Sequence, residues 1–477
     1  MSIKLDKKAV FSNTAWQIIV RIVAIVLTFV SVKLLATYLG TGGVGEYNTI
    51  TTYINFFIVI ADLGLFSVTV REISKKPENE SKIISNVLAI RLMSVLVASA
   101  IAIFIVFLTK YNFNIKLGTL VATGFLIFNL LGSVYDAVLQ YRLKMQYSAI
   151  AEFLSKVLTI IALYIIVINH GSFLWIISTV TLSGILIFLF KWLFARKFVE
   201  PLRQYDLKFM KLIFNMAWPL GLVFIVNNLY FKLDTLMLYA IKGATAVGIY
   251  SVSYKVLEVT VFAGSYFSSA LKPTISSHMA KDKEYIGGIM TKAINIMLLI
   301  SLPITLMCIL YSKEIILFLS NQDFITGSTA LVILSFALPL IYLDTLLGEI
   351  LVANDEKKLL IRIALSILAF NFIANLIFIP LYSFKAAAFT TLASEALLFI
   401  INYHYTQKII KYRIDFSNVT KILATALLTY AIMILFNSVN VHFIVKIALS
   451  FAVYMALTAM FKIVTIEGAR NLLRKAE

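Results

Sequence analysis

The sequence has few of the residues on which most enzymes and disulfide-stabilised proteins depend. It contains one cysteine, Cys308, so no disulfide can form within the chain. Its four histidines lie far apart without metal-ligand spacing, so no metal site is predicted. A phosphate-binding P-loop is also missing from the sequence, which excludes ATP hydrolysis by this chain as its energy source. We therefore expect neither a catalytic site nor a cofactor.

Charged residues are also scarce. They make up 14% of the 477 residues, whereas about a quarter is typical of soluble domains. Hydrophobic residues make up 61%, and the mean hydropathy is +0.93. A helix needs about 20 apolar residues to cross the hydrocarbon core of a bilayer. The composition therefore predicts an all-α polytopic membrane protein with about 14 transmembrane helices.

Fourteen apolar stretches are long enough to be membrane spans. Short connections separate them, apart from the basic stretch 191–211, so no separate soluble domain is expected. The predicted spans are 12–38, 47–69, 84–108, 117–139, 148–168, 172–190, 212–238, 246–269, 289–311, 329–351, 360–381, 386–405, 419–437 and 443–461.

The basic residues are distributed unequally between the two sides of these spans. Of 42 Lys and Arg, 27 fall on the side of both termini, five fall on the other side, and ten lie within spans. Lys and Arg in short loops favour the cytoplasmic side. We therefore predict cytoplasmic termini in a plasma membrane. The net charge of +18 is mainly a topology signal, because it is not gathered on one soluble face as in nucleic-acid proteins.

An internal repeat divides the chain. Gly40–Tyr47 resembles Gly243–Tyr250, 203 residues later, and Trp16 and Trp218 lie in similar contexts 202 residues apart. Six spans separate the copies, an even number, so the two copies have parallel topology. We predict two six-helix lobes with pseudo-two-fold symmetry, residues 1–200 and 201–410. Residues 411–477 would form two further helices and a basic tail.

The repeat preserves a stripe of polar residues. Asn48, Thr52, Asn55 and Asp62 lie on one helical face of the second span. Adding 203 to each number gives a second stripe on the eighth span: Ser251, Lys255, Glu258 and Ser265. Polar stripes in a membrane must face protein or water. Both spans are therefore expected to line a central cavity between the lobes.

Cations inside the spans indicate an anionic ligand. Arg21 in the first span and Lys232 in the seventh would join Lys255 near the middle of the molecule. Such a cluster repels itself unless an anion binds, and phosphate suits both guanidinium and ammonium groups. The predicted substrate ligands are Arg21, Lys232, Lys255, Gln17, Asn55 and Asn228.

Pairing within the protein is the alternative explanation for these charges. Lys255 could pair with Glu258, Lys232 with Asp234, and Glu152 with Lys156 at helical spacing. For Glu152 and Lys156 we favour this structural interpretation. Some intramembrane acids could instead bind a coupling proton or sodium ion. The candidates for ion coupling are Asp62, Asp234 and Glu258.

Several short motifs resemble the polysaccharide-flippase branch of the multidrug/oligosaccharidyl-lipid/polysaccharide exporter superfamily. In the first half they are Leu34–Gly40, Val44–Tyr47, Ala61–Leu65 and Val70–Glu72. In the second half, Asp234 is followed by Ala246–Lys255. The resemblance extends over the whole chain, but the motifs are short and apolar and do not identify a substrate.

This resemblance implies a fold like that of multidrug exporters of the MATE type, with two lobes around a V-shaped cavity that opens alternately to each side. Members of the O-antigen flippase type move a polyprenyl-diphosphate-linked oligosaccharide from the cytoplasmic to the outer leaflet, coupled to an ion gradient. Their cationic cavities agree with the assignment of Arg21, Lys232 and Lys255 to the diphosphate. The resemblance also implies a monomer, with membrane lipids and glycan-assembly proteins as partners.

The sequence fits two other functions less well. A cation-coupled multidrug exporter would often carry an acid in its first span, where this chain has Arg21 and no acid. A membrane glycan polymerase or acyltransferase would need a large outer loop or a catalytic histidine in the membrane, and neither is evident. The sequence therefore favours a flippase over both alternatives.

Overall fold

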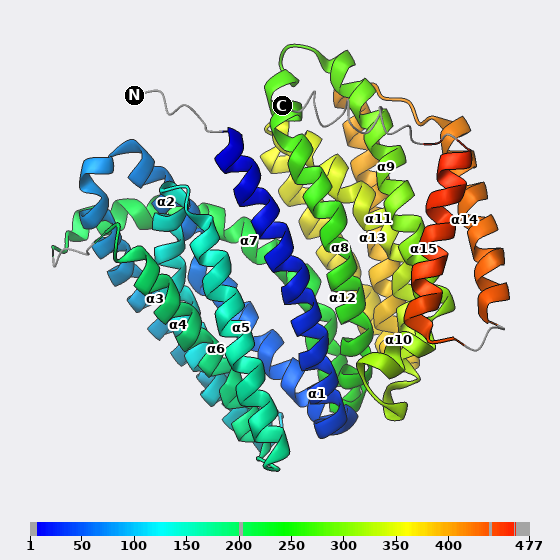
Figure 1. The fold of residues 1–477 in the computed structure, drawn as a ribbon. Coiled ribbons are helices and arrows are strands. Elements are labelled where there is room, and N and C mark those ends of the chain that lie inside the picture. Colours follow the sequence, from blue (N-terminus) through cyan, green and yellow to red (C-terminus); the bar gives the residue numbers. More distant parts are fainter. Residues whose placement is uncertain (1–6, 200–203, 438–440, 462, 464–477) are drawn as a thin grey trace. The chain divides into compact units, whose positions relative to one another are not determined.

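The computed structural model describes residues 7–199, 204–437, 441–461 and 463, without the side chains of 7–22, 220, 222–224, 226–228, 231 and 437. Within these residues the secondary structure is helical, with no strand. The helices form two units, Met1–Gly248 and Ile249–Glu477, which are described separately (Figure 1).

The first unit contains seven helices and the start of an eighth. They are α1 (Lys7–Asp62), α2 (Leu65–Lys75), α3 (Glu80–Leu108), α4 (Phe113–Tyr141), α5 (Met145–Ile168), α6 (Phe173–Ala195), α7 (Leu207–Lys242) and the first residues of α8 (Ala244–His278). A short 3-10 turn, η1 (Pro77–Asn79), precedes α3. The second unit holds the rest of α8, then α9 (Lys283–Leu310), α10 (Ser312–Leu319), η2 (Gln322–Phe324), α11 (Gly327–Ala353), α12 (Lys357–Tyr382), α13 (Phe384–Ile409), α14 (Phe416–Asn437) and α15 (Phe443–Met460).

Twelve described segments are long and apolar enough to cross a membrane. One of them, Val23–Lys75, contains the second predicted span and the part of the first that begins at Val23. Gly40 bends α1 between these two spans (φ 63°, ψ −174°). The predicted seventh span lies within α7, part of whose side chains are not described. The predicted class of an all-α polytopic protein is confirmed.

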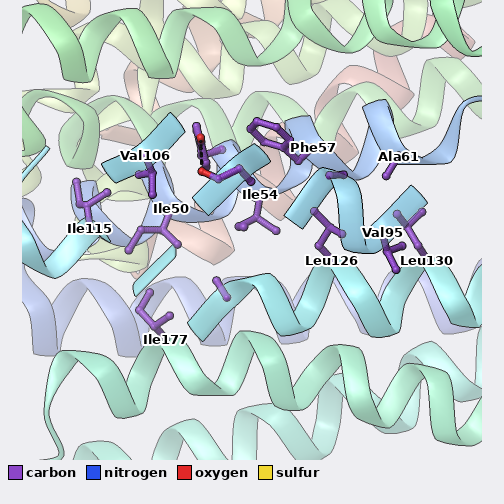
Figure 2. Packing of buried hydrophobic residues seen from close by; sticks show 14 residues of the cluster. Ile50, Ile54, Phe57, Ala61, Val95, Val106, Ile115, Leu126, Leu130 and Ile177 are labelled. Carbon is purple, nitrogen blue, oxygen red and sulfur yellow. Dashed lines mark hydrogen bonds between the residues drawn. The ribbon is translucent and has the colours of Figure 1, made fainter. Parts of the chain in front are cut away.

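The core of the first unit forms where α1, α3, α4 and α6 meet. Figure 2 shows Ile54 and Phe57 of α1 packing with Leu126 of α4 and Val95 of α3. Small residues bring α4 and α6 together: a Cβ added at Gly184 would lie 2.9 Å from the Phe125 Cα. Close contact of this kind replaces hydrophobic burial as a source of helix association in lipid.

The second unit is built around α11, which packs against α9 and α13. Helices α14 and α15 pack on each other and on α9 (Figure 1). A buried chain of hydrogen bonds links α12 to α13: Thr390 donates to Asn375 (2.6 Å), and Asn375 donates to Asn371 (2.9 Å). These bonds satisfy amides that would be costly to leave unpaired in lipid.

The internal repeat is visible in the backbone. Gly243, between α7 and α8, has φ 79° and ψ −174°, nearly the values of Gly40. This region of φ and ψ is essentially restricted to glycine. Both residues therefore form tight turns at equivalent places in the two copies of the repeat.

Two other glycines of the repeat, Gly45 and Gly248, do not form turns. They lie inside α1 and α8 and permit a close helix crossing instead. A Cβ at Gly45 would lie 1.8 Å from the Ala244 carbonyl oxygen, and one at Gly248 would lie 1.9 Å from that of Thr41. Since Ala244 is Thr41 plus 203, the two contacts are equivalent under the repeat.

Candidate substrate site

A polar cavity of about 220 Å³ lies inside the first unit, between both halves of α1 and helices α4, α5 and α6. The predicted ligand Asn55 lines it, one helical turn from Thr51. The Asn55 amide donates to the Thr51 carbonyl oxygen (2.7 Å), and its side chain is exposed. Its amide oxygen can therefore still accept a hydrogen bond from a ligand.

The opposite wall of this cavity comes from α5 and α6. Its lining residues include Lys156, Thr159 and Ser183. The Thr159 hydroxyl is buried and has no hydrogen-bond partner within the described residues. Lysine, asparagine and serine side chains around one cavity are suited to bind phosphate oxygens or sugar hydroxyls. Spacing alone did not identify Lys156 as a cavity residue, since it predicts only a pair with Glu152.

The predicted cations Lys232 and Lys255 lie in different units, on α7 and α8. Lys255 forms an ion pair with Glu258 one turn along α8, which is the internal pairing that the spacing predicts. Both side chains remain about one-third exposed (32% and 35%), so neither is sealed from water or ligand. The side chains of Gln17, Arg21 and Asn228 lie outside the described residues, so the predicted cluster stays a prediction.

Asp62, a candidate for ion coupling, ends α1. Its carboxylate accepts from Arg91 of α3 (2.8 Å) and from the Gly64 backbone N–H (3.2 Å). Arg91, which is 1% exposed, also donates to the carbonyl oxygens of Ala61 and Asp62 (3.2 Å each). These contacts satisfy groups that a helix end leaves unpaired. They give Asp62 a structural role, and its coupling role stays a prediction, as do those of Glu258 and the buried Asp234.

A second ionic cluster, which sequence patterns do not predict, lies near the end of α6 around the buried Lys191. The ammonium group of Lys191 lies 2.6 Å from Asp136 of α4 and 3.0 Å from Glu152 of α5. Ser148 donates to Asp136 as well (2.6 Å). Lys191 was expected to begin the basic connection, but α6 continues to Ala195 and buries it. The cluster holds three helices together.

Family models and solved structures together identify a multi-pass membrane transporter of the multidrug/oligosaccharidyl-lipid/polysaccharide exporter superfamily. The structure is similar to that of "Lipid II flippase MurJ, inward closed conformation" (TM-score 0.80, 16% identity, 94% of this chain and 98% of that one). It is also similar to an inward-facing multidrug resistance MATE transporter of the same superfamily (TM-score 0.63, 12% identity, 82% and 98% covered).

Within that superfamily, the chain belongs to the polysaccharide biosynthesis protein family, whose model matches residues 10–279. The MatE model matches residues 219–381. These findings confirm the predicted family and the predicted class of transporter rather than enzyme.

Two proteins of Haloferax volcanii are similar in sequence. The "Probable low-salt glycan biosynthesis flippase Agl15" is 21% identical over 285 residues, which are 58% of this chain and 60% of that protein. The "Probable flippase AglR" is 26% identical over 171 residues, 35% and 36% of the two chains. The match therefore spans less than two thirds of either relative.

Proposed function

We propose that this protein is a flippase that moves a polyprenyl-diphosphate-linked oligosaccharide from the cytoplasmic to the outer leaflet by alternating access. The observation that carries the proposal is the set of cationic and polar side chains inside apolar spans, Lys156, Lys232 and Lys255 among them. Charges in this position are costly and mark substrate or ion pathways. Family membership and the names of the similar proteins support a lipid-linked glycan as the cargo.

The proposed roles follow from chemistry. Arg21, Lys232 and Lys255 hold the diphosphate, while Gln17, Asn55 and Asn228 hydrogen-bond to its oxygens or to the first sugars. Lys255 can exchange its carboxylate partner for phosphate when Glu258 binds a proton. Glu258 would thus link ion binding to substrate binding, with Asp62 and Asp234 as the other coupling candidates.

Loss of a cation should strongly reduce export. We expect Arg21→Ala, Lys232→Ala or Lys255→Ala to lower surface glycan about tenfold or more, since a charge-assisted hydrogen bond contributes about 1.5–3 kcal/mol. Antibody detection of surface glycan, normalised to protein in the membrane, measures this. Lys358→Ala, an exposed lysine at the start of α12, is the matched control. Normal glycan export in all three variants would refute these roles.

A cation-coupled multidrug exporter remains the second candidate, because the MatE model also matches part of the chain. It predicts that resistance to cationic dyes depends on Asp62 or Glu258. The absence of an acid from the first span and the Asp62–Arg91 ion pair speak for the flippase. Dye resistance that is lost in Glu258→Gln while glycan export persists would favour the exporter.

The proposed orientation places both termini in the cytoplasm, with lobes 1–200 and 201–410 and the C-terminal part 411–477. Cysteine labelling can test this orientation because Cys308 is buried. Lys110→Cys, in the exposed α3–α4 connection, should react with an impermeant maleimide in intact cells. Lys281→Cys, in the exposed α8–α9 connection, should react only after permeabilisation. The reverse pattern would invert the topology.

A further inference from the structure

An apolar groove of about 500 Å³ runs along the first unit, separate from the polar cavity. Its walls come from the end of the second half of α1, from α3 and from the start of α7. Ile60, Met93, Val97 and Phe214 are typical of these walls, and Ser94 is among the few polar side chains. Met93 and Val97 are 60% and 59% exposed, so the groove opens toward the surroundings of the protein, which in a membrane are lipid.

The length of the groove matches one leaflet. Its α3 wall extends from Ile90 to Ile101. Eleven residues of helix rise about 16 Å, and one leaflet contributes about half of a hydrocarbon core of ~30 Å. A groove of this length can hold one acyl chain along its path.

The α7 wall of the groove carries a cation. Lys211 is the one charged residue among its lining residues, and it lies one turn into α7. The exposed Lys208 precedes it by three residues and lines an adjoining polar notch. Lys211 belongs to the basic stretch 191–211, which the charge distribution assigns to the cytoplasmic side.

Polar contacts hold the start of α7, which carries Lys211, against α3. Asp206 caps α7 by accepting from the Phe209 N–H (3.1 Å), and this hydrogen bond holds the pKa of the Asp206 carboxyl below its usual value. Asp206 also pairs with Lys82 of α3 (3.2 Å). Because Lys82 is neutralised in this way, Lys211 and Lys208 supply a net positive charge beside the groove.

We propose that this groove binds an anionic phospholipid of the cytoplasmic leaflet, with one acyl chain between α1, α3 and α7 and its phosphate on Lys211. The apolar walls suit an acyl chain, the length of the groove equals that of one leaflet, and the ammonium group of Lys211 complements the phosphate of the headgroup. This lipid site is independent of the flippase proposal, since it concerns binding of a bilayer component and not of cargo.

Native mass spectrometry of the full chain, released from vesicles of phosphatidylglycerol and phosphatidylcholine, tests the site. We expect one phosphatidylglycerol to be retained preferentially. Lys211→Gln should reduce its retention about fivefold, the factor for one Lys–anion contact at a membrane surface. Lys358→Gln, on α12, is the charge control and should leave retention unchanged.

A second pair of variants tests whether the apolar part of the groove binds the acyl chain. Val97→Trp should fill the groove and remove the retained lipid, while Phe104→Trp, also exposed on α3 but outside the groove, should not. Equal retention of phosphatidylcholine, or no effect of Lys211→Gln and Val97→Trp, would overturn the proposal. So would displacement of the phospholipid by trace polyprenyl phosphate, because the occupant would then be a cargo-like lipid.

Discussion

Gly45→Ala is expected to lower the free energy of unfolding of the protein in detergent by about 1–3 kcal/mol, the usual cost of overpacking. The added methyl group would lie 1.8 Å from the Ala244 carbonyl oxygen, a backbone atom that cannot rotate away. Gly248→Ala should cost a similar amount through the Thr41 carbonyl oxygen. Thermal unfolding followed by size-exclusion chromatography measures both variants.

The double variant distinguishes this explanation from a general loss of helix packing. Both substitutions separate the same crossing of α1 and α8, so the second should cost less than the first. Gly42→Ala is the control: a Cβ there meets no atom within 4 Å, and alanine favours helix. Full additivity, or an equal cost for Gly42→Ala, would contradict the reciprocal contact.

The spans were predictable from sequence because membrane helices must be long and apolar. The turns at Gly40 and Gly243 were predictable because the repeat places glycine at equivalent connections. The crossing at Gly45 and Gly248 was not, since sequence does not indicate which backbone lies opposite a glycine. Local spacing describes one helix and leaves its neighbours undetermined.

The candidate site shows the same limit. Pairing of Lys255 with Glu258 was predictable, because both lie on α8 three residues apart. The partner of Asp62 was not, because Arg91 lies on another helix, 29 residues later. Periodicity placed Asn55 on a polar face, but the cavity there also required Lys156 from α5. Contacts between helices depend on packing, which a single sequence pattern does not contain.

Lys191→Met should destabilise the protein by about 3–5 kcal/mol, because it leaves the largely buried Asp136 carboxylate without its cation. The Lys191 side chain is 5% exposed, and it contacts both Asp136 and Glu152. Methionine fills much of the same volume, so loss of charge rather than of packing dominates. Thermal unfolding of the purified protein measures the effect.

Removal of the whole cluster should restore most of the lost stability. The triple variant with Lys191→Met, Asp136→Asn and Glu152→Gln carries no uncompensated charge, and replacing all members of a buried ion cluster is often neutral. Lys197→Met, at an exposed position shortly after α6, serves as the control for charge removal. If the triple variant were less stable than Lys191→Met, the acids would contribute through contacts other than the lysine. Recovery of stability in the triple variant would show that the cluster holds α4, α5 and α6 together through ion pairing.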